Sequence, residues 1–140
     1  MAHSVYAENG AFKFYMVDAG LLYSKFYIAA NVVLHTPHSF DGFKGAICQN
    51  YIFQALVTLG VTTYYWSSNG KAEVDIVFHN KEGVIIPLEA ISAENVKAKS
   101  LRRYRDIYKP EFVIRVSEKT FGYENGIKSI PLYALFALTF

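Results

Sequence analysis

The stretch "GKAEVDIVFHNKEGVIIPLEAIS" at residues 70–92 decides the fold, because it contains two apolar runs joined by a short polar turn. Three-residue hairpin loops commonly end on a glycine in the left-handed conformation, and Lys81, Glu82 and Gly83 supply that pattern. The stretch therefore predicts an antiparallel hairpin of two strands centred on Glu82.

Two carboxylates stand at matching positions in this hairpin. Asp75 and Glu89 lie at equal distances from Glu82, so the ladder pairs them unless a bulge shifts the register. Paired side chains share one face with Cβ atoms about 5 Å apart, and facing like charges destabilise a sheet unless a cation lies between them. The pattern predicts a Mg²⁺ or Mn²⁺ site with Asp75 and Glu89 as ligands. The period of two puts Glu73 on the face of Asp75.

A plain structural explanation of the same pair stays open. Strands that are half buried routinely alternate polar and apolar residues, and an acid pair at a solvated rim costs only a few tenths of a kcal/mol. On that interpretation Asp75 and Glu89 hold no metal and have no chemical role.

Upstream of the hairpin the sequence predicts two strands and two helices. "FKFYMV" at 12–17 and "TTYYWSS" at 62–68 have the aromatic and β-branched composition of strands. A helix is expected over 21–33, and a longer one over 42–59 that Asp41 caps and Gly60 closes.

Downstream of the hairpin, Asn95 offers an N-cap for a helix over 96–108, which Pro110 ends, and "EFVIRVS" at 111–117 is a further strand. The core order is then helix, three strands, helix, strand. This order predicts an α/β fold with a central mixed sheet flanked by helices.

Length and composition predict one domain over residues 1–140, since 140 residues with 52% hydrophobic content form one core. Cys48 is the only cysteine, which excludes an internal disulfide and favours a reducing compartment. The apolar stretch at 130–140 is shorter than the roughly 20 residues that span a bilayer, so we expect a docked terminal segment and no membrane partner. The N-terminus lacks the pattern of a secretory signal, and a cytoplasmic protein is expected.

The sharpest charge cluster lies in "VKAKSLRRYRDIYK" at 96–109. Basic side chains interleaved with Tyr104 and Tyr108 suit contact with the phosphates and bases of nucleic acid. The alternative is an ordinary solvated helix face with Leu101, Tyr104 and Tyr108 packed inward. The residues that we expect to bind DNA or RNA are Lys97, Lys99, Arg102, Arg103 and Arg105.

Five segments together carry a family resemblance: "FYMVDAGLL" (14–22), "KGAICQNYIFQAL" (44–56), "YYWSSNGKAEVDIVF" (64–78), "IPLEAISAENVKAKSLRRYRDIYKPEFVIRVS" (86–117) and "FGYENGIKSIPLYAL" (121–135). They resemble the domain of unknown function that follows the ATPase module in predicted prokaryotic AAA-superfamily ATPases. That domain is similar to the restriction-endonuclease-like fold of the PD-(D/E)XK superfamily, whose core has the same order of elements.

The resemblance also assigns roles to four positions. Asp75 in "AEVD" matches the catalytic aspartate and Glu89 in "PLEAI" matches the catalytic glutamate, while Ile91 stands at the lysine position and Gln49 at the helix glutamate position. Ile91 offers no charge or proton, and Gln49 lacks the negative charge that helps to hold a metal. The resemblance therefore implies a degenerate site that binds Mg²⁺ or Mn²⁺ weakly and cleaves nothing.

Three functional hypotheses follow. The first is a non-catalytic module that binds nucleic acid or a protein partner on behalf of a P-loop ATPase. No phosphate-binding glycine loop is present, so nucleotide would bind to an N-terminal ATPase module, and this chain would be a C-terminal fragment or the product of a split gene. The second is an active Mg²⁺-dependent nuclease in which Lys97 or Lys99 replaces the lost lysine. The third is a structural or homo-oligomerisation module lined by aromatic residues, which make up 16% of the chain.

Overall fold

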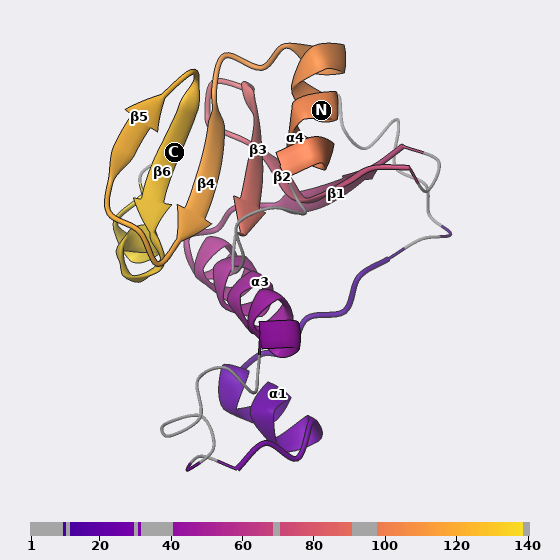
Figure 1. The fold of residues 1–140 in the computed structure, drawn as a ribbon, viewed down its shortest axis with the longest axis vertical. Helices are drawn as coiled ribbons and strands as arrows, with labels where there is room; N and C mark the ends of the chain where they lie inside the picture. The colour runs from indigo at the N-terminus through magenta and orange to yellow at the C-terminus, as the bar shows by residue number, and fades with distance from the viewer. Residues whose placement is uncertain are drawn as a thin grey trace.

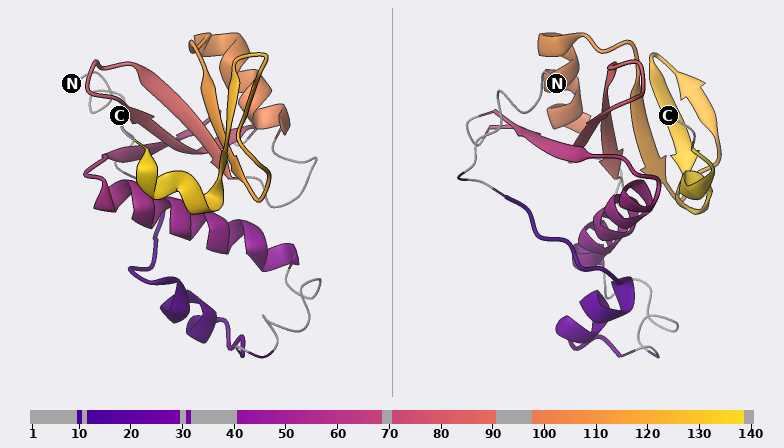
Figure 2. Two further views of the ribbon diagram at one scale, coloured as in Figure 1. Left: turned by 90° about the vertical axis from the view of Figure 1, so that its left-hand side faces the viewer. Right: turned by 180° about the vertical axis from the view of Figure 1, so that it is seen from behind.

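The computed structural model describes residues 10, 12–29, 31, 41–68, 71–90 and 98–138. These residues form a mixed six-stranded sheet in the order β1-β2-β3-β4-β6-β5, with helix α3 on one face and helix α4 on the other (Figures 1 and 2). The expected α/β class with a mixed sheet flanked by helices is thus confirmed. The expected core order appears as α3 (Asp41–Thr58), β1 (Thr63–Ser67), β2 (Glu73–His79), β3 (Ile85–Ala90), α4 (Ala98–Tyr108) and β4 (Val113–Ser117).

The predicted hairpin is present as β2 and β3. Its recorded pairs run from Ile76↔Leu88 to His79↔Ile85, which is the register centred on Glu82. Gly83 has φ +81°, the left-handed conformation that a side chain would strain. The Asn80 side-chain oxygen accepts hydrogen bonds from the backbone N–H groups of Glu82 (3.0 Å) and Val84 (2.8 Å), which fixes the turn locally.

The second half of the sheet is parallel and then antiparallel. Strand β4 pairs in parallel with β3 and with β6 (Ile127–Pro131), and β5 (Gly122–Glu124) pairs antiparallel with β6 at the edge. Asn125 and Gly126 both have positive φ, 51° and 74°, as the two central residues of a type I′ turn require. The Asn-Gly dipeptide is the sequence signal for this β5–β6 hairpin, which the sequence analysis did not predict.

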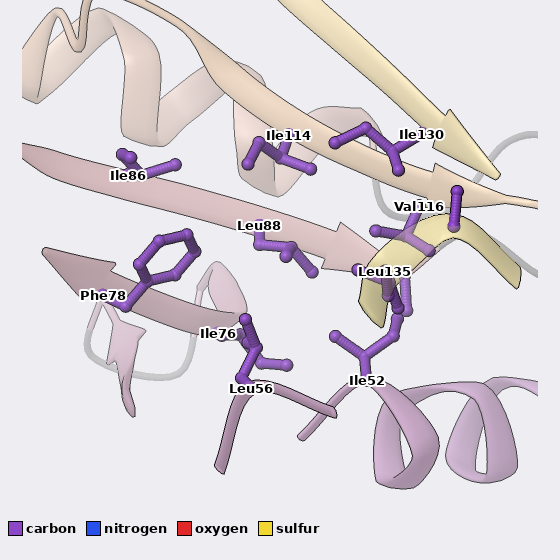
Figure 3. Close-up of a cluster of buried hydrophobic side chains, with 12 residues drawn as sticks. Ile52, Leu56, Ile76, Phe78, Ile86, Leu88, Ile114, Val116, Ile130 and Leu135 are labelled. Atoms are coloured by element: carbon purple, nitrogen blue, oxygen red, sulfur yellow. The ribbon is translucent and has the colours of Figure 1, made fainter. Parts of the chain in front are cut away.

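Two hydrophobic clusters lie on the two faces of the sheet. On one face Ile52 and Leu56 of α3 pack against strand residues and against Leu135 of the short helix η2 (Leu132–Ala137), so the expected docking of the C-terminal apolar stretch is confirmed (Figure 3). We call this the α3-face cluster; it comprises Ile52, Leu56, Ile76, Phe78, Ile86, Leu88, Ala90, Ile114, Val116, Ile130, Ala134 and Leu135. The α4-face cluster comprises Val74, Val77, Leu101, Tyr104 and Val113.

The N-terminal predictions need correction. Residues 12–16, which we call the N-terminal strap, form no strand; they run as a single extended segment toward α3, drawn in indigo in Figure 1. The strap meets helix side chains instead of a strand edge, because Asn50 supplies both an acceptor and a donor to the backbone of Met16. The first helix, α1 (Ala19–Lys25), is capped by Asp18 through the Leu21 N–H (3.2 Å) and ends at a turn in which Tyr27 has φ +55°, so the single helix expected over 21–33 is wrong. Residues 30 and 32–33 of that prediction lie outside the described residues.

The other helix predictions are close to the structure. Helix α3 begins at Asp41 and ends at Thr58, followed by a Schellman-type end in which Gly60 (φ +75°) donates to Val57 O and Val61 donates to Leu56 O, both at 2.9 Å. Helix α4 begins at Ala98, and the expected cap at Asn95 with residues 96–97 lies outside the described residues. No helix among the described residues is both long and apolar enough to cross a membrane.

Candidate functional site

Glu89 lies on the α4 face of the sheet. Its neighbours Leu88 and Ala90 both belong to the α3-face cluster, and strand alternation turns the residue between them to the opposite face. Glu89 is 3% exposed, and its parallel partner Arg115 lies between Ile114 and Val116 in the same way. Glu89, the glutamate of the predicted site, is thus buried on the α4 face of the sheet, next to Arg115 on the neighbouring strand.

Asp75 lies on the other face because of a bulge in β2. Strand β1 pairs Tyr64 with Val77 and Trp66 with Val74, so two residues of β2, Asp75 and Ile76, stand opposite one residue of β1. Val74 belongs to the α4-face cluster, and alternation from it directs Asp75 to the α3 face. Ile76 is also on the α3 face, so the bulge gives two consecutive residues the same face.

The expected shared face of Asp75 and Glu89 is therefore wrong, although the hairpin register is right. One further step of the β2–β3 register would bring the two residues opposite each other, but the bulge turns Asp75 away from Glu89. Within the described ranges no group of three or more His, Cys, Asp or Glu side chains is placed to hold a metal ion. The two predicted metal ligands therefore lie on different faces of the sheet.

Lys13 of the strap is a partner of Asp75. Its ammonium forms ion pairs with Asp75 Oδ1 (3.1 Å) and with Glu73 Oε1, and it lies 5.3 Å from the centroid of the Tyr65 ring. The side chains of Lys13 and Asp75 are 25% and 13% exposed, so this interaction is largely screened from water. The prediction that Glu73 shares a face with Asp75 agrees with their common partner. We call Lys13, Glu73 and Asp75 the Lys13 site.

Gln49 stands where the resemblance places a helix glutamate. A hydrogen bond to Tyr15 of the strap brings Gln49 close to the Lys13 site. Its side-chain amide donates to the Tyr15 hydroxyl at 3.0 Å, and the Tyr15 ring stacks on Phe53 of α3 with centroids 3.9 Å apart and planes at 8°. The strap thus brings Gln49 and Asp75 into one neighbourhood, with Lys13 and Tyr15 between them. Sequence reasoning missed Lys13 and Tyr15, because both precede the predicted hairpin by more than 50 residues and no local pattern links them to it.

Burial and charge act together on the two strap residues. Burial lowers the pKa of Lys13, but the hydrogen bonds and negative charges of Glu73 and Asp75 together outweigh it and leave that pKa above its ordinary value of 10.5. Burial raises the pKa of Tyr15, and the positive charge of Lys13 opposes only part of that rise. Lys13 is therefore a charged ammonium and Tyr15 a neutral phenol at neutral pH.

Helix α4 has a buried inward side and an outward side that carries Arg102 and Arg103, while Tyr108 in its last turn is 55% exposed. Leu101 and Tyr104 are 3% and 4% exposed, and Tyr104 packs edge-on to Trp66 at 5.2 Å. The Trp66 indole donates to the hydroxyl of Tyr108 at 3.1 Å. Burial, with a smaller contribution from Tyr108, raises the pKa of Tyr104 to about 12. Tyr104 is thus a core residue and is not accessible for stacking on a base.

The basic candidates of α4 differ in their surroundings. Arg102 and Arg103 are exposed, and neither forms an ion pair with a described residue. Arg105 is half buried and donates to the carbonyl of Asn125 at 2.7 Å, which ties α4 to the β5–β6 turn. Ile91 and Lys97 lie outside the described residues, as does the side chain of Lys99.

A family comparison matches the whole sheet, helix α4 and most of helix α3. The family described as a domain of unknown function (DUF4143) matches residues 44–135, from the first turn of α3 into η2. No curated protein and no solved structure matches the chain. The strap that carries Lys13 and Tyr15 precedes the matched range.

Proposed function

The chain belongs to the DUF4143 family, and we propose that it is a non-catalytic binding domain of the restriction-endonuclease-like kind that contacts nucleic acid through the outward face of α4. The resemblance to domains that follow an ATPase module adds that it serves a P-loop ATPase. The observation that carries the proposal is the pair of exposed arginines, Arg102 and Arg103, on a helix whose opposite side is fixed in the core.

The arrangement of the carboxylates supports the absence of cleavage. A metal-dependent nuclease needs acidic ligands that converge on one cation beside the scissile phosphate. Here Asp75 pairs with Lys13 on the α3 face, whereas Glu89 is buried on the α4 face. Gln49 donates a hydrogen bond to Tyr15 and brings no negative charge. A Mg²⁺ or Mn²⁺ ion would find its two expected ligands on opposite sides of the sheet.

The electrostatics of α4 support contact with phosphate. A rigid helix that presents adjacent guanidinium groups to solvent can hold backbone phosphates with little loss of conformational freedom, since Leu101 and Tyr104 already fix the helix. Such contacts release counterions, so binding falls steeply as salt concentration rises. Tyr104 is buried against Trp66 and cannot reach a base, and stacking on the exposed Tyr108 would not distinguish one base from another, so we propose binding that depends on charge and shape and not on base sequence.

The test is fluorescence anisotropy of labelled duplex DNA, single-stranded DNA and RNA titrated with the protein over a range of salt concentrations. We expect the double variant Arg102→Gln, Arg103→Gln to lose about two units from the slope of log K against log salt, since each phosphate contact contributes about 0.9. The control Lys71→Gln, Lys81→Gln removes the same charge from two exposed turns and should leave the slope unchanged. Absence of binding by the wild type at low salt would refute the proposal.

Self-association is a second candidate function, favoured by exposed aromatic residues beside and within β5 and on η2. Phe121 and Tyr123 are 66% and 68% exposed, and Tyr133 and Phe136 of η2 are 69% and 72% exposed. The outer edge of β5 pairs with no described strand, and an open edge with aromatic neighbours suits pairing with a second chain. Light scattering should then report a mass that rises above that of the monomer with concentration; a constant monomer mass contradicts this candidate.

A further inference from the structure

We propose that Lys13 acts as the built-in cation of the Lys13 site: its ammonium holds the Glu73–Asp75 carboxylate pair in place of a divalent metal ion and keeps that pair closed to Mg²⁺ and Mn²⁺. The residues that share the cation are thus Glu73 and Asp75, and not the expected pair Asp75 and Glu89. This inference is independent of nucleic-acid binding by α4.

Strand β2 carries a pair of carboxylates on one face. Glu73 and Asp75 are two positions apart on one strand, and both reach the same ammonium. Two carboxylates held this close repel each other unless a cation neutralises them. A cation is present in the structure at this position, and it is the Lys13 ammonium, itself only 25% exposed.

The strap that carries the ammonium is held on helix α3 by its other residues. Met16 donates to the Asn50 carbonyl oxygen (2.7 Å) and accepts from the amides of Asn50 (3.1 Å) and Gln54 (2.6 Å). Tyr15 is held by its stack on Phe53. Helix α3 therefore fixes the strap through residues other than Lys13, and the chain need not leave this position when the charge of Lys13 is removed.

Removal of the Lys13 charge would leave a set of oxygen atoms that suits a divalent cation. Without the ammonium, the strand presents two carboxylates that are partly screened from water, and the Gln49–Tyr15 hydrogen bond adds neutral oxygens in the same neighbourhood. Carboxylate and neutral oxygen donors are the ligands of hard divalent cations such as Mg²⁺ and Mn²⁺. In the wild type the Lys13 ammonium neutralises the two carboxylates, so a metal ion has to displace that ammonium to bind.

The experiment compares the wild type with Lys13→Gln, which keeps the length and polarity of the side chain and removes its charge. We expect MnCl₂ to raise the melting temperature of Lys13→Gln by several degrees and to leave that of the wild type unchanged, because a ligand that binds only the folded state stabilises it. The Lys13→Gln, Asp75→Asn double variant should lose the response. Lys71→Gln is the matched control, since it removes a lysine charge from the nearby β1–β2 turn and should show no response.

Terbium luminescence gives a second readout that does not depend on the stability of a variant. Tb³⁺ bound at Asp75 would be sensitised by Tyr65, whose ring lies beside Lys13. We expect little luminescence from the wild type and a clear increase from Lys13→Gln. Two results would overturn the inference: Tb³⁺ or Mn²⁺ binding by the wild type that Asp75→Asn removes, or a folded Lys13→Gln variant that binds neither ion.

Discussion

Asn50 joins the N-terminal strap to helix α3 with both ends of its amide. It is 3% exposed, its carbonyl oxygen accepts from the Met16 N–H and its amino group donates to the Met16 carbonyl. The Asn50 amide thus pairs with the backbone of Met16 as a neighbouring strand would, although residues 12–16 form no strand. This pairing satisfies both backbone groups of Met16, which burial would otherwise penalise.

Asn50→Asp should therefore destabilise the protein by about 1–3 kcal/mol, because a carboxylate keeps the acceptor but faces the Met16 carbonyl with a second oxygen instead of a donor. Urea unfolding at neutral pH measures the change in the free energy of unfolding. Thr58→Ala removes an exposed hydroxyl that bonds to the carbonyl one helical turn earlier, and this control should change stability by less than about 0.5 kcal/mol. Equal losses in the two variants would contradict the role given to Asn50.

Tyr104 links stability to alkaline pH. Its pKa is about 12 in the folded state and about 10 in the unfolded chain, so between these values the folded state holds a proton that the unfolded state has lost. The stabilising contribution is complete below pH 10 and is lost as pH rises toward 12, on the order of 2–3 kcal/mol in total. Tyr104→Phe should reduce that loss in urea unfolding measured from pH 9 to 12.

Two other groups contribute to the same alkaline range. The raised pKa values of Tyr15 and Lys13 also make the folded state bind protons more tightly above pH 10, so Tyr104→Phe removes only part of the decline. Tyr123→Phe makes the same substitution on an exposed β5 residue and should leave the pH dependence unchanged. The prediction for Tyr104 fails if both variants lose stability with pH as the wild type does.

At the scale of single elements, helix ends and turns are well specified by sequence. Gly60 closes α3 at φ +75°, and Gly83 completes the hairpin turn at φ +81°, as their sequence contexts predict. Strand β2 is predicted with the right partner and register, but its bulge at Asp75 and Ile76 is not. Both neighbours of Asp75 are β-branched and apolar, so alternation alone gives no sign of the extra residue.

Gly60→Ala tests the helix end. A Cβ at Gly60 meets no atom within 4 Å, so the cost comes only from the left-handed backbone and should be about 1 kcal/mol. Gly122→Ala adds the same atom to β5, where it makes an ordinary contact at 3.8 Å with Ser129 and the backbone conformation is not left-handed. Thermal unfolding should show a lower melting temperature for Gly60→Ala and little change for Gly122→Ala; the reverse order would contradict this account.

The strap shows where element prediction fails and why. Its aromatic and apolar residues have strand composition, but a strand also needs a free sheet edge, and here the side chains of α3 take that place. Composition reports local preference, whereas the partner of Met16 lies 34 residues away. For the same reason Lys13 cannot be inferred as a partner of Asp75, from which it is separated by 62 positions.

At the scale of the whole molecule, the order of elements and the mixed sheet are predictable, because hydrophobic periodicity and turn residues act locally and agree with one another. The positions of the candidate-site residues are less predictable. Gln49 and Asp75 do share a neighbourhood, as the resemblance implies, while Glu89 lies on the opposite face. The bulge in β2 therefore places Asp75 and Glu89 on opposite faces, although the sequence pattern predicts that they face each other.

The central claim is that this domain binds nucleic acid and leaves it intact. The most direct measurement incubates labelled duplex DNA with the wild type in Mn²⁺ at low salt and resolves the products on native and denaturing gels. The account predicts a retarded band on the native gel, weakened in Arg102→Gln, Arg103→Gln, and full-length DNA on the denaturing gel. DNA that runs free on the native gel, or that is cut by the wild type and not by Asp75→Ala, would contradict it.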